Sequence, residues 1–180
     1  MTEVSIRRAV STDLPSLMAF DHSCQTDYVW QMDVPDAEGQ AGAIFRQVRL
    51  PRTISISYPR QVSALSETWN RRSGMLVALI ADQPVGYLRL SDMILPRTAW
   101  ITDVVTTMRY RRQGVALALI LAAQSWAMDR KNTRALIEMS SKNYPAICLA
   151  RKLGYEFCGY NDHYYYETQD IALFFGRVLR

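Results

Sequence analysis

The chain has 180 residues, of which 49% are hydrophobic and 21% are charged, with a formal net charge of +4. The length fits one domain and the composition is that of a folded protein, which excludes a disordered or fibrous chain. The mild charge argues against a nucleic-acid-binding protein. No apolar run approaches the roughly 20 residues of a membrane-spanning helix, and the N-terminal residues carry no apolar signal segment. We therefore expect a cytoplasmic protein that binds neither nucleic acid nor a membrane.

The first part of the chain predicts a few short elements. Alternating apolar residues predict a strand over 4–10, and residues 11–13 are favourable N-caps for a helix that follows at once. The next segment is less regular. Within it we expect a strand over 44–58, interrupted by Pro51, and a helix over 62–70.

The second part of the chain has stronger signals. Two apolar runs separated by Asp82-Gln83-Pro84 predict a β-hairpin. The predicted elements, in chain order, are strands over 75–81, 85–90 and 98–105, an arginine-rich loop, a helix over 114–129, a strand over 134–140, a helix from Asn143 to Gly154, and strands over 155–160 and 170–179. A long helix between strands makes the fold class α/β, in a mixed α+β arrangement.

The segment around Gly114 predicts a binding site for phosphate groups. A strand runs into an arginine-rich loop, and Gly114 leads directly into the long helix. The first turn of a helix has unpaired N–H groups and partial positive charge. Arg111 and Arg112 add formal charge, and the small residues Gly114 and Ala116 leave room for a pyrophosphate. The alternative is an arginine-rich surface turn before an ordinary core helix.

Two motifs resemble those of the GNAT N-acetyltransferases, which use acetyl-CoA. The first, Arg/Gln-x-x-Gly-x-Gly/Ala, reads Arg111-Arg112-Gln113-Gly114-Val115-Ala116. The second, Asn-x-x-Ala ahead of Lys-x-Gly-Phe, reads Asn143-Tyr144-Pro145-Ala146 followed by Lys152-Leu153-Gly154-Tyr155. The resemblance is strong over 75–160. The tail over 170–179 is similar to the C-terminal strand of streptothricin-acetyltransferase-like members.

The resemblance implies a single domain over 1–180, with a central, twisted, mostly antiparallel sheet of about six to seven strands and about four flanking helices. It also implies a splayed parallel strand pair at the acetyl-CoA site. The cofactor-binding core would lie at about 75–160, and the acceptor-side elements at about 11–70 and 160–168. The residues implied in acetyl-CoA binding are Val104, Val105, Thr106, Arg111, Arg112, Gln113, Gly114, Val115, Ala116, Asn143 and Ala146.

Two carboxylates are our candidates for the catalytic base. An amine acceptor arrives protonated and must lose a proton before it attacks the thioester. Asp103 and Glu138 each interrupt an apolar strand, where an acid is costly unless it is paired or functional. The alternative is that each carboxylate forms a structural ion pair with an arginine such as Arg89 or Arg134.

The position of the usual catalytic acid is altered. Many GNAT enzymes have a tyrosine seven residues after the motif asparagine, and it protonates the departing CoA thiolate. This chain has Ala150 there. A thiol with a pKa of about 8.5 gives a fairly stable thiolate, so we expect water or a tail tyrosine to supply the proton. Tyr164 is our third candidate catalytic residue.

Carboxylates mixed with aromatic residues, over 21–33 and 160–167, favour a small cationic acceptor through ion pairs and cation–π contacts. His22 and His163 do not form a recognisable metal pair, and we expect no metal site. The apolar C-terminal strand leaves pairing across a homodimer open.

These observations predict an N-acetyltransferase that moves the acetyl group of acetyl-CoA to a primary amine, by direct attack in a ternary complex. The small cationic amine is the favoured acceptor. Two alternatives stay open: an acyl-CoA-binding sensor or regulatory domain without efficient turnover, and an acetyltransferase for protein N-termini or lysines.

Overall fold

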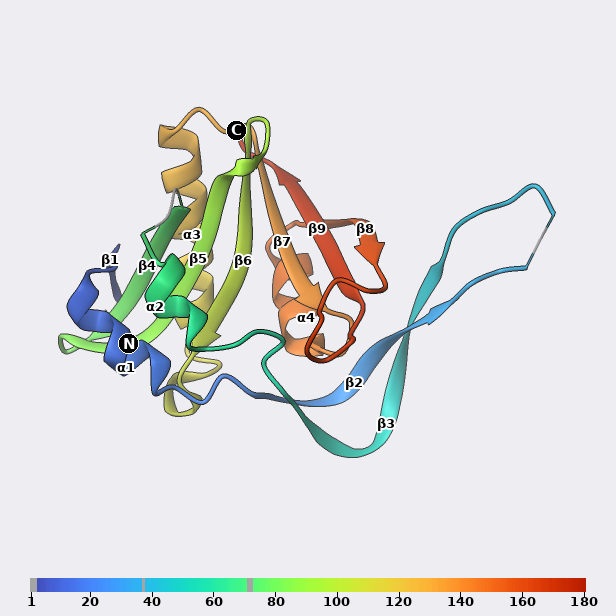
Figure 1. Cartoon of the computed structure of the whole chain (residues 1–180), viewed down its shortest axis with the longest axis horizontal. Coiled ribbons are helices and arrows are strands. Elements are labelled where there is room, and N and C mark those ends of the chain that lie inside the picture. Colours follow the sequence, from blue (N-terminus) through green and yellow to red (C-terminus); the bar gives the residue numbers. More distant parts are fainter. Residues whose placement is uncertain (1–2, 37, 71–72) are drawn as a thin grey trace.

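The computed structural model describes residues 3–36, 38–70 and 73–180, and within these ranges it contains a seven-stranded sheet and a separate two-stranded sheet (Figure 1). The strand order of the large sheet is β1-β4-β5-β6-β7-β9-β8. Its strands are Ser5–Arg8 (β1), Ser73–Ile80 (β4), Gln83–Leu95 (β5), Thr98–Thr106 (β6), Arg134–Ser140 (β7), Glu156–Asn161 (β8) and Ala172–Val178 (β9).

The helices of the described residues cover both faces of the large sheet. They are α1 (Leu14–Met18), α2 (Ala64–Thr68), α3 (Val115–Asp129) and α4 (Tyr144–Lys152), with short 3-10 turns η1 (Ser11–Asp13) and η2 (Met108–Tyr110). Neighbouring strands are antiparallel except for β6 and β7, which are parallel. The predicted fold class, a mostly antiparallel sheet with about four helices and one parallel pair, is confirmed.

The parallel pair separates along its length. Pairing of β6 with β7 ends at Ile101 and Ile137, whereas β6 continues beside β5 and β7 continues beside β9. The two strands diverge in Figure 1 after the region where they pair. Glu138 directly follows the last paired residue of β7, and Asp103 lies just beyond the last paired residue of β6. The two strands therefore separate at the two predicted bases.

The core lies on both sides of the first strands of the sheet. Side chains of a strand alternate between its faces, and in β4 Leu76 and Ala78 pack with α3, while Val77 and Leu79 pack with α1 and α2. Burial on both faces explains why this strand appears in the sequence as a continuous apolar run.

The remaining two strands form a hairpin that the sequence prediction did not anticipate in full. β2 (Cys24–Asp33) and β3 (Ile44–Ile56) pair with each other and extend away from the large sheet (Figure 1). The expected interruption at Pro51 is wrong, because β3 continues through it. Pro51 lies where the register shifts, between the pairs Tyr28–Arg49 and Thr26–Ile54, so its missing N–H removes no regular ladder bond.

The C-terminal strand, whose pairing across a homodimer the sequence left open, has no free edge. β9 is bonded to β7 on one side and to β8 on the other. Both of its edges are therefore occupied within the chain, and β8 is the outer strand.

Gly86 of β5 allows α3 to begin close to the sheet. A Cβ atom at Gly86 would lie 2.8 Å from the carbonyl oxygen of Val105 and 3.1 Å from a methyl group of Val115, the first residue of α3. Backbone and helix would both have to shift to accept it. Any side chain larger than hydrogen at this position therefore disturbs the contact between the helix start and β6.

We predict that Gly86→Ala lowers the free energy of unfolding by about 1–3 kcal/mol, the usual cost of overpacking. The matched control is Gly159→Ala in β8, whose added Cβ would meet only Phe174, at 3.8 Å. Urea unfolding of both variants measures the difference. Equal losses would show that the contact at the start of α3 is not tight.

Candidate active site

Asp103 and Glu138 face each other across the opening between β6 and β7, and both are 5% exposed. The guanidinium of Arg60, from the segment between β3 and α2, lies between them. Its Nη1 is 3.1 Å from Oδ1 of Asp103, and its Nη2 donates a hydrogen bond to Oε1 of Glu138. One cation thus bridges the two buried carboxylates.

Asp103 has further donors. The Tyr58 hydroxyl donates to Oδ1 at 2.5 Å, the Thr102 hydroxyl donates to Oδ2 at 2.8 Å, and Nη1 of Arg89 lies 3.5 Å from Oδ2. The ion pair with Arg89 that we considered as an alternative is therefore present. The one with Arg134 is not, because the Arg134 guanidinium lies against Gly176.

Glu138 is held by donors from three segments of the chain. Besides Arg60, it accepts from Nε1 of Trp100 at 2.6 Å and from the hydroxyl of Tyr164 at 2.8 Å. Tyr164 lies in the loop between β8 and β9, so the third predicted catalytic residue reaches Glu138. Burial raises the pKa of Tyr164, which keeps its hydroxyl a donor at neutral pH.

A hollow of about 480 Å³ adjoins this cluster. It lies between the segment before α2 and the β8–β9 loop, and its lining residues are Pro59, Arg60, Gln61, Ala64, Tyr164, Tyr165, Tyr166 and Glu167. The Arg60 guanidinium stands 5.2 Å from the centre of the Tyr165 ring. The tyrosine rings and the Glu167 carboxylate already lie around one cation, Arg60. Groups of this kind also suit a cationic ligand.

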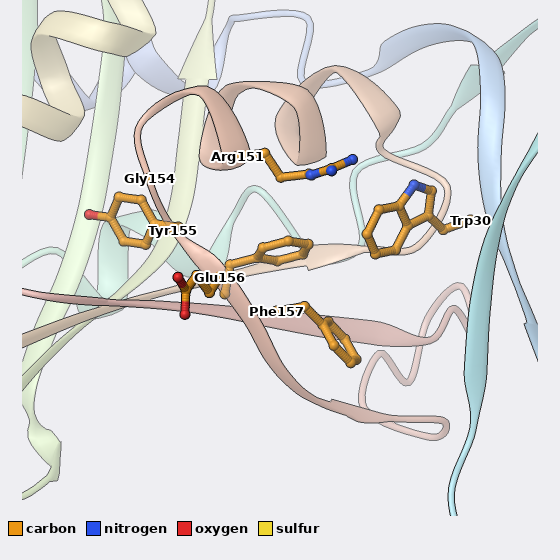
Figure 2. A pocket seen from close by; sticks show the side chains of 7 residues that line it. Trp30, Arg151, Gly154, Tyr155, Glu156 and Phe157 are labelled. Atoms are coloured by element: carbon orange, nitrogen blue, oxygen red, sulfur yellow. The ribbon is translucent and has the colours of Figure 1, made fainter.

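A second hollow, of about 530 Å³, lies away from the carboxylates, between β2, α4, β8 and β9 (Figure 2). Trp30, Phe157 and Phe175 form aromatic walls, and the Arg151 guanidinium lies 5.9 Å from the Trp30 ring. None of the three candidate catalytic residues lines it. Trp30 belongs to the predicted acceptor segment over 21–33, but it lines this second hollow and not the one beside the carboxylates. The residues of that segment therefore do not all lie at one site.

The proposed phosphate loop is open at the start of α3. Gly114 precedes the helix with a φ of 87°, and a Cβ there would meet nothing within 4 Å. Arg112 and Gln113 are exposed beside it. The predicted role of Arg111 needs correction, because its guanidinium donates to the carbonyl oxygens of Thr106, Asp21 and Ser23 at 2.6–3.1 Å. Arg111 therefore ties the loop to the start of β2 and does not face the helix start.

The second motif shapes α4. Asn143 is the N-cap, and its Oδ1 accepts from the N–H of Ala146 at 3.2 Å. Ala150, at the position of the usual tyrosine, is 1% exposed and belongs to the hydrophobic core. Ala150 itself has no group that could act as the acid.

Residues 45–155 match the acetyltransferase (GNAT) family, which is more than half of the chain. The chain belongs to the GNAT acetyltransferase family. Enzymes of this family use acetyl-CoA as co-substrate, so the predicted enzyme class and cofactor are confirmed.

Relatives of this GNAT domain include streptothricin acetyltransferase of Streptomyces lavendulae, which is 25% identical over 167 residues, 90% of this chain and 86% of the relative. The crystal structure of nourseothricin acetyltransferase has a TM-score of 0.84 at 23% identity, covering 98% of this chain and 99% of that one. A Bacillus anthracis structure described as a streptothricin acetyltransferase, in complex with acetyl coenzyme A, has a TM-score of 0.78 at 20% identity over the same shares. The two structures confirm the fold.

Two further absences concern the described residues of this GNAT domain. No group of three or more His, Cys, Asp or Glu side chains there is placed to hold a metal ion. No helix in the described ranges is long and apolar enough to cross a membrane.

We predict that Arg60→Ala lowers the free energy of unfolding at neutral pH by about 3–5 kcal/mol, because it leaves two buried carboxylates without their shared cation. The matched control is Arg46→Ala, whose ion pair with Asp33 is exposed and should contribute little to stability. Similar losses in both variants, measured by urea unfolding, would contradict the bridging role.

Proposed function

We propose that this enzyme transfers the acetyl group of acetyl-CoA to a primary amine of a small cationic molecule, by direct attack in a ternary complex at the opening between β6 and β7. The observation that carries the proposal is the pair of buried carboxylates, Asp103 and Glu138, beside a tyrosine-lined hollow. Streptothricin, named for two of the relatives, is the acceptor to test first.

The donor side is formed by β6 and the start of α3. Beyond Ile101, β6 stays paired with β5 but has no pairing with β7, so the backbone groups of 104–106 that point away from β5 are free to bond the pantetheine arm. The pyrophosphate would lie on the unpaired amides around Gly114, with Arg112 beside them. A backbone N–H at Val105 or a neighbouring residue would stabilise the developing oxyanion of the thioester.

The two carboxylates have different roles on the acceptor side. Glu138 accepts from Arg60, Trp100 and Tyr164, and its carboxylate would hold the ammonium group. A cationic acceptor competes with Arg60 for this place. Asp103 takes the proton of the ammonium group.

The chemical step then follows from this placement. The amine nitrogen bonds to the acetyl carbon, the carbon–sulfur bond breaks, and the sulfur keeps the electron pair as the CoA thiolate. Burial raises the pKa of Tyr164, so its hydroxyl still carries a proton when the thiolate forms, and water or Tyr164 then returns a proton to sulfur. The Asp103 proton leaves before the next turnover.

We predict that Gly114→Trp abolishes acetyl-CoA binding, because the indole would cover the amides at the start of α3. Binding at about 100 times the dissociation constant should add about 2.7 kcal/mol of stability to the unaltered protein, which thermal unfolding detects. Gly154→Trp is the matched control, since Gly154 also has a positive φ of 75° and an open Cβ position. A shift retained in Gly114→Trp would contradict the proposed phosphate site.

We predict that Asp103→Asn lowers kcat for streptothricin by about 10²–10⁴-fold while acetyl-CoA still stabilises the variant, as expected for loss of a base. Thiol release measures the rate, and Asp33→Asn, at an exposed carboxylate, is the control. A normal rate in Asp103→Asn would contradict its role.

Acetyl-CoA binding without turnover of any amine by the unaltered enzyme would favour the sensor alternative, and turnover of peptides alone would favour the protein acetyltransferase.

A further inference from the structure

The carboxylate of Glu138 receives its three hydrogen bonds unevenly. Nε1 of Trp100 and the hydroxyl of Tyr164 both donate to the same atom, Oε2, at 2.6 Å and 2.8 Å. Arg60 donates to the other oxygen, Oε1. The Glu138 side chain has no surface exposed to solvent. A ligand therefore reaches this carboxylate only by replacing one of its three donors.

The three donors differ in their position relative to the tyrosine-lined hollow beside the carboxylates. Arg60 and Tyr164 line this hollow, whereas Trp100 is not part of its lining. Trp100 lies in β6, at a point where that strand is paired with β5 on one side and with β7 on the other. The Trp100 indole therefore bonds Glu138 from outside the hollow, and its backbone is fixed within the sheet.

The ring of Phe174 supports both donors that meet at Oε2. Phe174 of β9 is the residue opposite Glu138 of β7, and side chains of opposite residues lie on the same face of a sheet. The Phe174 ring meets the Trp100 ring edge-on, with centroids 5.4 Å apart, and the Tyr164 ring in the same way at 5.5 Å. Edge-to-face contacts are favourable, so packing against one ring keeps both donors close to Oε2.

Trp100 is the donor that remains at Oε2 throughout the proposed reaction. Its indole N–H only donates, and it takes no part in proton transfer. Arg60 leaves Glu138 when a cationic acceptor takes its place, and Tyr164 is a candidate to return a proton to the CoA thiolate. A carboxylate that loses these two donors in turn is still held by the bond from Trp100.

We infer that Trp100 is a positioning residue for the acceptor: its N–H holds Oε2 of Glu138, so that Oε1 is the oxygen that binds the acceptor ammonium group in place of Arg60. The inference rests on the proposed function, in which Glu138 binds this ammonium group. Trp100 itself contacts neither substrate. Without its N–H, the carboxylate is free to turn, and Oε1 is no longer held toward the acceptor.

The test is the steady-state kinetics of Trp100→Phe, which removes the N–H and keeps an aromatic ring beside Phe174. We expect KM for streptothricin to rise about tenfold, through loss of a hydrogen bond to a charged group, while kcat stays within about threefold. The KM for acetyl-CoA should not change. Trp126→Phe is the matched control, because the buried Nε1 of Trp126 has no hydrogen-bond partner among the described residues. A KM for streptothricin that is unchanged in Trp100→Phe, or raised equally in Trp126→Phe, would overturn the inference.

Glu138→Gln distinguishes positioning from a general effect on the fold. If Trp100 acts through Glu138, adding Trp100→Phe to Glu138→Gln should raise KM for streptothricin no further, because the charge that Trp100 positions is already gone. Effects that multiply in the double variant would show that Trp100 acts independently of Glu138, which contradicts the inference.

Failure of the inference can be told apart from failure of the proposed function. A normal KM for streptothricin in Glu138→Gln would contradict the proposed role of Glu138. A raised KM in Glu138→Gln beside a normal KM in Trp100→Phe would contradict the inference alone.

If streptothricin is not acetylated, NMR still tests the hold on Oε2, since the chain has only four tryptophans and so four indole N–H signals. The Trp100 signal is the one that disappears in Trp100→Phe. It should shift in Glu138→Gln, which changes its acceptor, and in Tyr164→Phe, which removes the second donor to the same oxygen. A Trp100 signal that is unchanged in both variants would contradict the inference.

Discussion

The ion-paired cluster at the splay of β6 and β7 is the interaction on which the site depends. Two carboxylates are buried where the parallel strands lose their mutual backbone pairing, and burial of either charge alone would be costly. Arg60 compensates both at once, and Arg89 adds a second cation beside Asp103. Because Arg60 comes from the segment after β3, the same contact fastens the N-terminal part of the chain to the splayed strands.

In the proposed function, donor and acceptor bind to different parts of the sheet. The proposed phosphate loop and the side of β6 that β7 leaves unpaired lie at the start of α3, while the tyrosine-lined hollow lies between the segment before α2 and the β8–β9 loop. Arg111 joins the two parts, since it bonds the end of β6 and the start of β2. The carboxylates lie between them, as a direct transfer in a ternary complex requires.

The sequence alone could identify features that depend on neighbours along the chain. Gly114 ahead of an apolar helix predicted the phosphate-binding loop. Acids within apolar strands predicted Asp103 and Glu138 as site residues. Arg60 could not be found in this way, because its partners lie 43 and 78 residues away and its own segment has no regular pattern. β2 was missed because most of its residues are only half-buried and its mixed polar and aromatic residues lack the apolar run of a core strand. The place of β9 inside the sheet could not be predicted for a similar reason, since nothing local reveals that β8 takes the outer position.

The most direct measurement is a crystal structure of the enzyme with CoA and streptothricin. The account predicts the CoA thiol in the opening between β6 and β7, the pyrophosphate at Gly114, and an acceptor amine against Asp103 and Glu138 with Arg60 displaced. An acceptor bound in the hollow beside Trp30 and Arg151, with Arg60 still bridging the carboxylates, would contradict it.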